Sequence, residues 1–384
     1  MPFAQYSRRA FSRVIGQSLA FAFAAPALRA IRGMGSAAKP TAPALPAKIH
    51  LNFNENPYGP TPKALEALSS CGSAAARYPD GAYEQVRDAL ATTHGVKREN
   101  ILLGCGSTEI LRAADMTFLG PGQSVVAAEP TFEAVLDVAR VARATPVKIP
   151  LTADHRHNLP AMAAACTSKT GLVYVCNPNN PTGTIVTLQE LANFIPRVPS
   201  TTLILVDEAY FHFAENPEYG SVIDWIEKHP NLLVARTFSK IYGMAGMRLG
   251  YGIGSKETIK AMEDQILKDN GNAAVLSAAI ASLGDKEYVA TSRARMNATR
   301  SWLADELTKD GRTFIPSDAN FMMIDMGTDV RPIIEQFAAR NILVGRRFPS
   351  MNNFLRVTIG TQAEMEAFVG ELREIAPARV AKAA

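Results

Sequence analysis

The stretch LILVDEAY at residues 203–210 decides the fold, because four apolar residues run into two acidic ones without any alternation. A continuous apolar run of this length is typical of a strand that is buried on both faces of a sheet. Comparable runs occur at Leu172–Cys176, Leu232–Ala235 and Leu249–Ile253, with helix-like segments between several of them. Strands that alternate with helical segments predict an α/β fold with a mostly parallel sheet.

Further elements extend this pattern on both sides of the quoted stretch. The strands expected to complete a sheet of seven lie at Ile101–Leu103, Ser124–Ala128 and Thr145–Ile149, and helices are expected at 83–94 and 107–118. A long, broken helical stretch is expected from about residue 256 to 307. The elements after it predict a smaller α/β domain: strands at 319–325, 342–344 and 354–359, and helices at 330–340 and from 363.

Three polar residues lie at or just beyond the ends of predicted strands. Asp207 ends the strand quoted above, Lys240 follows the strand at 231–235 within RTFSK, and Arg248 comes eight residues later. In α/β folds, ligands bind at this carboxyl edge of the sheet. A lysine for a Schiff base, an arginine for a phosphate and an aspartate for a pyridinium nitrogen are the groups needed to hold pyridoxal 5′-phosphate. The sequence therefore predicts a site for this cofactor.

Together, these and other motifs resemble the class I and II aminotransferases of fold type I, and within them the histidinol-phosphate aminotransferase branch. The resemblance runs from about Leu51 to about Thr361. Its carriers are NFNENPYGP (52–60), RYPD (77–80), GCGSTE (104–109), NPNNPTG (177–183), TFSK (237–240) and FLRVTIGT (354–361). It implies a large cofactor-binding domain at 76–275, a small C-terminal domain at 276–384, and an N-terminal arm at 48–75 that packs with the small domain.

The resemblance also implies a role for each polar residue around the cofactor ring. Lys240 is expected to bind the cofactor covalently and then to move the proton between the substrate Cα and the cofactor. Asp207 is expected to pair with the pyridinium nitrogen, while Asn180 and Tyr210 hydrogen-bond the phenolic oxygen. Phe132 is expected to stack on the ring. From sequence alone, Asp207 also suits a helix N-cap, Asn180 a turn and Phe132 the core.

The cofactor phosphate needs hydrogen-bond donors and positive charge. The segment after Gly104 opens a helix, whose free amide groups form an anion site to which the Ser107 and Thr108 hydroxyls add. Thr237, Ser239 and Arg248 are expected to close this site from the other side. By resemblance, Tyr78 reaches the phosphate of a second copy, so the chain is expected to form a homodimer with shared active sites.

Substrate recognition is expected to depend on Arg356, which lies in the otherwise apolar strand FLRVTIG (354–360). A guanidinium in such a strand is costly unless it has an anionic partner, and its planar fork suits the substrate α-carboxylate. By resemblance, Asn56 and Tyr58 line the substrate pocket. Small-molecule amino acids and 2-oxo acids are the expected partners.

The chain departs from the histidinol-phosphate branch after the strand at 342–344. The branch has an arginine at the next position that helps to bind the substrate phosphate, whereas this chain has Gly345 followed by Arg346 and Arg347. A shift of one residue in a strand turns a side chain to the other face. A bulge at Gly345 would restore the contact. Without it, a free amino acid is expected to be a better amino donor than histidinol phosphate.

The predicted function is that of a pyridoxal-phosphate-dependent aminotransferase, with ping-pong exchange of an amino group between an amino acid, or histidinol phosphate, and a 2-oxo acid. The same lysine and aspartate would also serve a decarboxylase, a carbon–sulfur lyase or an amino acid oxidase. A non-catalytic protein that binds the cofactor is a further alternative, although nothing in the chain reads as a fused DNA-binding module.

The N-terminus predicts export. Ser7-Arg8-Arg9 precedes a weakly apolar stretch that ends in small residues, an order that resembles a twin-arginine signal peptide at 1–27. A linker is expected at 28–47, and the mature enzyme is expected in the periplasm. A short amphipathic or disordered N-terminus is the alternative. Without Arg8, Arg9 and Arg13, 37 of the 40 basic residues face 36 acidic ones, which gives no reason to expect nucleic-acid or stable membrane binding.

Four cysteines show no metal-binding spacing, and no metal is expected. Their even number permits a disulfide in an exported protein but does not require one. Cys105 and Cys176 lie within strand-end motifs and are expected to be small buried side chains.

Overall fold

A computed structural model describes residues 47–267 and 270–377 of the chain. The predicted signal peptide at 1–27, and all but the last residue of the predicted linker at 28–47, lie outside the described residues.

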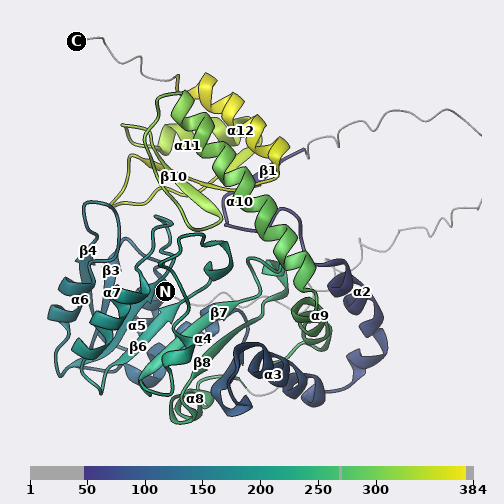
Figure 1. Cartoon of the computed structure of the whole chain (residues 1–384), viewed down its shortest axis with the longest axis vertical. Helices are drawn as coiled ribbons and strands as arrows, with labels where there is room; N and C mark the ends of the chain where they lie inside the picture. The colour runs from purple at the N-terminus through teal and green to yellow at the C-terminus, as the bar shows by residue number, and fades with distance from the viewer. Residues whose placement is uncertain (1–46, 268–269, 378–384) are drawn as a thin grey trace, which may run out of the picture. The chain divides into compact units, whose positions relative to one another are not determined.

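The central sheet has seven strands and is mostly parallel, as predicted (Figure 1). Strands β3 to β7 run parallel to one another, whereas β8 lies antiparallel between β7 and β2. In spatial order the strands are β2 (Ile101–Gly104), β8 (Gly250–Gly254), β7 (Leu232–Thr237), β6 (Leu203–Asp207), β5 (Thr170–Cys176), β3 (Ser124–Glu129) and β4 (Thr145–Pro150). Every residue of β5, β6 and β7 is buried, which explains why their sequences do not alternate.

Helices cover both faces of this sheet. Val173 and Val175 of β5 enter one core, and Leu172 and Tyr174 enter the other. The first core is closed by α3 (Asp80–His94), α6 (Leu159–Ala165), α7 (Leu188–Phe194) and α9 (Ala273–Gly284). The second is closed by α4 (Ser107–Phe118), α5 (Ala134–Val141) and α8 (Lys256–Glu263). The loops at the carboxyl ends of the strands therefore remain free to form a site.

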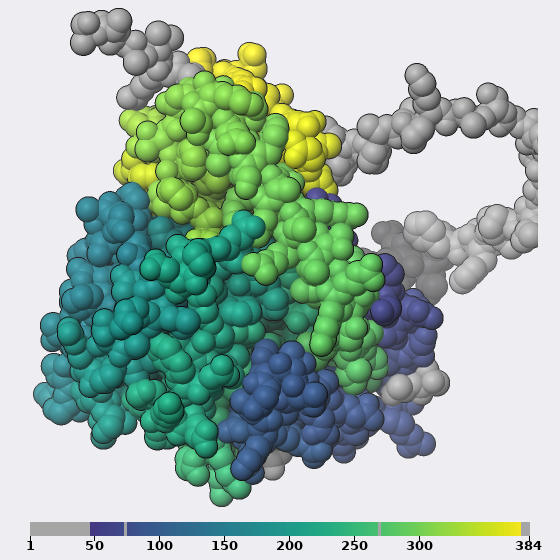
Figure 2. Space-filling model, viewed as in Figure 1, coloured from purple at the N-terminus to yellow at the C-terminus, as the bar shows by residue number. Residues whose placement is uncertain are grey.

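The C-terminal part builds a smaller α/β layer. Its antiparallel sheet places β10 (Phe321–Asp325) between β9 (Phe314–Ile315) and β12 (Phe354–Thr358), while β1 (Ile49–Leu51) pairs in parallel with β11 (Ile342–Val344). Helices α10 (Lys286–Lys309), α11 (Arg331–Ala339) and α12 (Gln362–Ile375) share its core. Figure 2 shows this yellow-green and yellow segment directly against the teal segment that carries central strands.

The structure corrects the predicted border between the two parts. The border at residue 275 falls inside α9, which contributes Val275, Leu276 and Ala279 to the core of the central sheet. Helix α10 then serves both parts, since Met296 enters the large core and Leu303 enters the small one. Within the N-terminal arm, β1 pairs with the small part, but α2 (Pro62–Ser70) packs on α9. Among the described residues, no helix has both the length and the apolar character needed to span a bilayer.

Candidate active site

A cavity of about 590 Å³ lies where the central sheet meets the smaller layer. The sequence-predicted residues that line it are Ser107, Thr108, Phe132, Asn180, Asp207, Tyr210, Thr237, Ser239, Lys240, Arg248 and Arg356. They come from α4, from the ends of β5 to β7 or the segments after β3, β5, β6 and β7, and from β12, so segments far apart in sequence meet in one site. Twelve further residues complete its wall, among them Asn52, Phe53, Asn54, Arg346 and Phe348.

Lys240 follows β7 and points into this cavity. Its Nζ donates a hydrogen bond of 3.0 Å to the Phe53 carbonyl and lies 5.6 Å from the centre of the Tyr210 ring. Burial, assisted by the positive charge of Arg356, lowers the pKa of Lys240 to about 8. A larger fraction of the amine is therefore neutral near pH 7 than for an ordinary lysine, and the neutral amine is the nucleophile and base.

Asp207 ends β6 with its carboxylate buried in the cavity wall. Tyr174 Oη donates to Oδ2 at 2.9 Å, and the Ala209 amide donates to Oδ1 at 3.1 Å. Burial raises the pKa of Asp207 to about 6, and the bond from Tyr174 opposes that rise. Tyr174 was not predicted from sequence, although a tyrosine within the apolar strand β5 was a signal, because a buried hydroxyl needs a partner.

Glycine creates the space for a phosphate site. Gly106 has φ +79° and ψ 162°, a conformation that other residues avoid, and a Cβ there would lie 2.2 Å from Arg248 Nη2. A Cβ on Gly250 would lie 2.1 Å from the Ser107 amide nitrogen. Arg248 donates to the Ala245 carbonyl at 2.8 Å and to Ser239 Oγ at 3.4 Å, and it has no carboxylate partner within the described ranges. A guanidinium and a helix N-terminus thus meet without a counter-ion, which fits a dianionic phosphate.

Tyr210 carries a hydroxyl that two amides hold in place. Its oxygen accepts hydrogen bonds from Asn54 Nδ2 at 3.0 Å and from Asn180 Nδ2 at 3.4 Å. Burial raises the pKa of Tyr210 well above its ordinary value, so the hydroxyl keeps its proton. That proton is available for an oxygen of a bound ring. The sequence analysis quoted Asn54 within a motif but assigned it no role.

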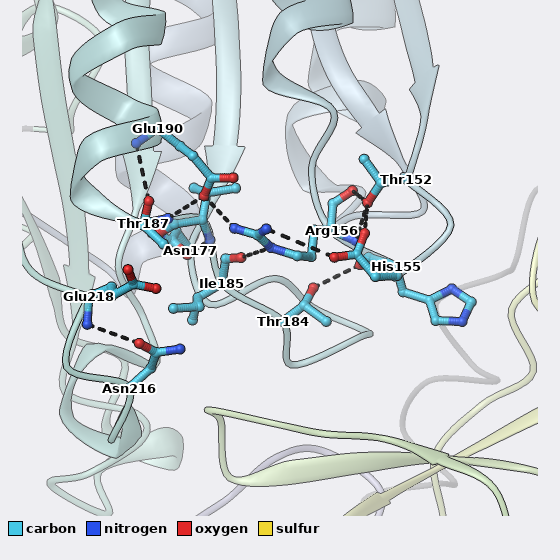
Figure 3. Close-up of polar contacts among 12 residues, drawn as sticks. Thr152, His155, Arg156, Asn177, Thr184, Ile185, Thr187, Glu190, Asn216 and Glu218 are labelled. Carbon is cyan, nitrogen blue, oxygen red and sulfur yellow. Dashed lines mark hydrogen bonds and ion pairs between the residues drawn. The ribbon is translucent and has the colours of Figure 1, made fainter.

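A polar network behind the cavity fixes the loop that carries Asn180 (Figure 3). The Asn177 side chain exchanges two hydrogen bonds of 3.0 Å with the Val186 backbone. Arg156 Nε donates to the Ile185 carbonyl at 2.8 Å, and its Nη2 pairs with Glu190 (Figure 3). These side chains thus hold the loop in addition to its own backbone bonds, such as the bond from the Asn179 amide to the Thr184 carbonyl at 2.8 Å.

Arg356 is buried, and all its contacts are with neutral groups. Its Nη1 donates to Asn180 Oδ1 at 2.7 Å and its Nη2 to the Asn52 carbonyl at 2.9 Å, while no carboxylate of the described residues pairs with it. Burial lowers the pKa of Arg356 to about 10, so the group remains a cation near neutral pH. A buried cation with no counter-ion, facing the cavity, is suited to bind a carboxylate from solution.

The segment after β11 shows which of the two arginines that follow Gly345 reaches the cavity. The strand ends at Val344, so strict alternation does not continue, and Arg346 lines the cavity while Arg347 turns to Asp329 at 2.7 Å. The Gly345 amide donates to the Arg356 carbonyl at 2.8 Å. A Cβ on Gly345 would lie 2.7 Å from that carbonyl oxygen and 3.1 Å from Arg356 Nε. Glycine is therefore required for this close approach.

Three predicted site residues do not line this cavity; for Asn56 and Tyr58 this corrects the prediction, whereas Tyr78 was expected to act in a second copy. Asn56 Nδ2 donates to the Ile241 carbonyl at 2.8 Å, so it supports the loop after Lys240 rather than lining the cavity. Tyr58 lies against Arg295, 5.6 Å from ring centre to guanidinium, in a separate depression. Tyr78 is 80% exposed and lines another depression.

The cysteines carry no chemistry that the structure reveals. All four are free, and Cys176 is buried as predicted, whereas Cys105 is exposed because it lies in the turn between β2 and α4. Among the described residues, no cluster of histidine, cysteine and acidic side chains could hold a metal ion.

Comparison with known proteins identifies the family. Residues 46–372 match the family Aminotransferase class I and II. The chain is 39% identical to the histidinol-phosphate aminotransferase of Moorella thermoacetica over 85% of both chains. It is 38% identical to the aromatic amino acid aminotransferase of Rhodococcus jostii, over 84% of this chain and 89% of the relative.

A solved structure agrees with these matches. The histidinol-phosphate aminotransferase of Sinorhizobium meliloti, in complex with pyridoxal 5′-phosphate, superposes with a TM-score of 0.81 at 28% identity, over 86% of this chain and 90% of that one. The chain therefore belongs to the class I and II aminotransferases, the fold-type I, pyridoxal-phosphate-dependent family that its motifs resemble.

Proposed function

We propose that this aminotransferase takes its amino group from a free L-amino acid with an aromatic or long polar side chain and passes it to a 2-oxo acid in a ping-pong reaction. The observation that carries this proposal is Arg356, a buried guanidinium without a carboxylate partner among the described residues, in the same cavity as Lys240. An α-carboxylate on Arg356 would bring the donor amino group and Cα towards Lys240.

The cavity residues suit pyridoxal phosphate, which supplies a pyridine ring that accepts electrons from the substrate Cα. Lys240 is the proposed covalent attachment residue and the base that moves the Cα proton. Asp207 would keep the ring nitrogen protonated, and Tyr210 with Asn180 would hydrogen-bond the ring oxygen. Phe132 would stack on the ring, and the phosphate would be held by Ser107, Thr108, Thr237, Ser239 and Arg248.

The apolar residues of the cavity wall favour amino donors with a partly apolar side chain. Its apolar members beyond the ring site are Phe53, Ile334, Val344 and Phe348. Phe53 is 67% exposed and lies on the arm whose carbonyl contacts Lys240, so it stands beside the entrance. An aromatic donor would cover these surfaces from water. The relative from Rhodococcus jostii, named for aromatic amino acids, supports this choice.

Histidinol phosphate is the second candidate donor, and Arg346 is the observation that favours it. This substrate carries a phosphate on a longer arm in place of the α-carboxylate, and Arg346 offers a second guanidinium in the same cavity as Arg356. The relative from Moorella thermoacetica bears that substrate in its name.

A donor panel with 2-oxoglutarate tests the proposal. Keto-acid formation from L-phenylalanine, L-tyrosine, L-glutamate, L-lysine and histidinol phosphate would be compared as kcat/KM, with oxygen uptake and carbon dioxide release followed in parallel. We expect a free amino acid to exceed histidinol phosphate. An equal or greater kcat/KM for histidinol phosphate would show that histidinol phosphate, the second candidate, is the preferred donor. Oxygen consumption or carbon dioxide release without amino transfer would replace aminotransfer by oxidation or decarboxylation.

We also propose that the enzyme is a homodimer in which Tyr78 reaches the phosphate site of the other copy. The support is its 80% exposure, which is unusual for a tyrosine. Tyr78 also does not line the cavity of its own chain but a separate depression of about 700 Å³, lined in part by Gly271 and Asn272. Light scattering of the purified enzyme is the test, and a fully active monomer would contradict the shared site.

Export to the periplasm remains our proposal from Arg8-Arg9 and the apolar stretch after them. Replacing both arginines by lysine should leave active enzyme in the cytoplasm, because twin-arginine export depends on that pair. A wild-type enzyme that stays in the cytoplasm with its N-terminus intact would refute the proposal.

A further inference from the structure

Arg346 lines the cavity, and its positive charge is already paired with a carboxylate of the protein. Its Nη2 lies 2.5 Å from Oε2 of Glu133, the only carboxylate among the described residues that pairs with it. Glu133 belongs to the central-sheet part and Arg346 follows β11 of the smaller layer, so the ion pair crosses the boundary between the two. Glu133 comes directly after Phe132, which lines the cavity.

The Glu133 side chain contacts the smaller layer and not its own helix. Glu133 occupies the N-cap of α5, where side-chain oxygens commonly accept a bond from the free amides and where negative charge is favourable. It makes no side-chain capping bond, and its carboxylate extends to Arg346 instead. The carboxylate is thus directed to Arg346 and not to the amides of its own helix.

One aromatic ring lies beside two of the three cavity arginines, Arg346 and Arg356. The guanidinium carbon of Arg346 lies 4.3 Å from the centre of the Phe348 ring, and that of Arg356 lies 5.3 Å from it. Phe348 is buried, and the charge of Arg346 is one of the causes that lower the pKa of Arg356. Besides Lys240 and the Arg248 of the proposed phosphate site, the cavity therefore contains two cationic positions, of which Arg356 has only neutral partners and Arg346 has Glu133.

We propose that Glu133 is a specificity-determining residue: its carboxylate occupies Arg346, the second cationic position, so that a substrate group binds there only by displacing it. A substrate with a neutral side chain leaves the Glu133–Arg346 pair closed, whereas a substrate with a second acidic group must displace the Glu133 carboxylate to reach Arg346. The inference rests on the proposed function, because it concerns how one cavity accepts donors and acceptors that differ in charge. It selects against dianionic substrates without excluding them.

The expected effect is modest. The side chains of Arg346 and Glu133 are 51% and 44% exposed, and partly exposed ion pairs contribute little because water and salt screen them. Removing the Glu133 charge should therefore strengthen the binding of a second acidic group by roughly 2- to 5-fold. Removing Arg346 itself should weaken such binding by about 10-fold or more, because a charged donor is lost.

Ligand binding without turnover provides the first test. Glutarate has two carboxylates and no amino or keto group, so its dissociation constant for the cofactor-loaded enzyme can be measured by titration calorimetry. We expect Glu133→Gln to bind glutarate roughly 2- to 5-fold more tightly than wild type. Arg346→Gln should bind it more weakly, and the double variant should match Arg346→Gln. Glu129→Gln is the matched control, since Glu129 pairs with Lys148 and does not line the cavity.

The second test compares donors. The ratio of kcat/KM for L-glutamate to that for L-phenylalanine should rise in Glu133→Gln and stay at the wild-type value in Glu129→Gln. An unchanged or lower ratio, or a Glu133→Gln effect that persists in the Arg346→Gln background, would overturn the inference while leaving aminotransfer intact. If the wild type transferred no amino group from any donor, the proposed function would fail, and the glutarate measurements would still decide the role of Glu133.

Discussion

Tyr174 on β5 lies two positions before the register partner of Asp207 on the neighbouring strand β6, and its hydroxyl donates to Asp207 Oδ2 at 2.9 Å. Both side chains are buried. A donor aimed at a buried carboxylate stabilises its charged form and so opposes the effect of burial on the pKa. The apolar strand β5 thus contributes to the ionisation of the residue proposed to face the cofactor nitrogen.

Replacing Tyr174 by Phe should therefore weaken cofactor binding in a pH-dependent way. Loss of a hydrogen bond to the carboxylate should raise the pKa of Asp207 above about 6, by roughly one unit. A smaller fraction of Asp207 is then ionised near neutral pH. As the pH is lowered, the affinity for pyridoxal phosphate should therefore begin to fall at a higher pH in the variant than in wild type. The measurement is the dissociation constant of pyridoxal phosphate for the cofactor-free protein between pH 5 and 9. Tyr251→Phe is the control, because that hydroxyl bonds His94, and a pH profile identical to wild type in Tyr174→Phe would contradict the argument.

Lys240 should be the single site of covalent cofactor attachment. Borohydride reduction followed by peptide mass mapping should label Lys240 alone, and Lys240→Ala should lower kcat by about 10²- to 10⁴-fold or more, because its proton transfer is lost. Lys240→Arg keeps a positive charge but no nucleophilic amine, so it should be as inactive as the alanine variant. A label on another lysine would remove the basis of the proposed site.

Gly106→Ala should weaken cofactor binding with little change in the rest of the fold. A Cβ there would lie 2.2 Å from Arg248 Nη2, so the guanidinium would have to move from the proposed phosphate site, and loss of a hydrogen bond to a charged group costs about 1–3 kcal/mol. The dissociation constant of pyridoxal phosphate should rise by roughly 5- to 150-fold. Gly122→Ala is matched, since Gly122 also has a positive φ but a Cβ there meets nothing. That control should lose stability only, and equal cofactor affinity in both variants would refute the phosphate assignment.

The residues at strand ends could be predicted from sequence, because buried parallel strands leave long apolar runs and the next polar residue must lie at the sheet edge. Asp207 and Lys240 are of this kind, and both line the cavity. The seven-stranded sheet followed from the same runs. Local pattern was sufficient there because burial on both faces dictates the residue types.

The remaining cavity residues depend on contacts that no local pattern encodes. Asn54 reaches Tyr210 across 156 positions of sequence, and the Phe53 carbonyl reaches Lys240 across 187. The placement of Arg346 could not be predicted without knowing where β11 ends. A strand one residue longer would have turned the Arg346 side chain away from the cavity. The border inside α9 was missed because a helix can bury its face against either part without a change of periodicity.

Asp115 on α4 should make the stability of the protein depend on pH. Its side chain is fully buried, neither oxygen has a hydrogen-bond partner, and burial raises its pKa from 3.8 to about 8. Between these values the folded chain holds a proton that the unfolded chain has released. The free energy of unfolding should therefore fall as pH rises from about 4 to about 8, by up to about 1.4 kcal/mol per pH unit.

Asp115→Asn should remove that dependence. Relative to wild type, the variant should gain roughly 2–4 kcal/mol more stability at pH 8 than at pH 5, measured by urea unfolding of the cofactor-loaded enzyme. Asp137→Asn, whose carboxylate is exposed on α5, is the matched substitution and should not reproduce this gain. If the free energy of unfolding varied with pH in the same way in wild type and Asp115→Asn, the pKa of Asp115 would not be raised on folding, and the prediction would be wrong.

Gly345→Arg would place an arginine at the position where the histidinol-phosphate branch has one, yet we expect it to damage the site. The Cβ alone would approach the Arg356 carbonyl to 2.7 Å and Arg356 Nε to 3.1 Å, so the new side chain must displace the guanidinium proposed to bind the α-carboxylate. Loss of a bidentate contact of this kind should cost on the order of 2–4 kcal/mol, or about 30- to 1000-fold in kcat/KM for free amino acids. Gly345→Ala should show a smaller loss of the same kind, because it introduces the clash without the charge, and Gly370→Ala, where a Cβ meets nothing, should show none. If Gly345→Arg instead raised the efficiency for histidinol phosphate and preserved that for amino acids, the segment after β11 would have to repack without cost, and Arg346 would not be the arginine that this cavity uses.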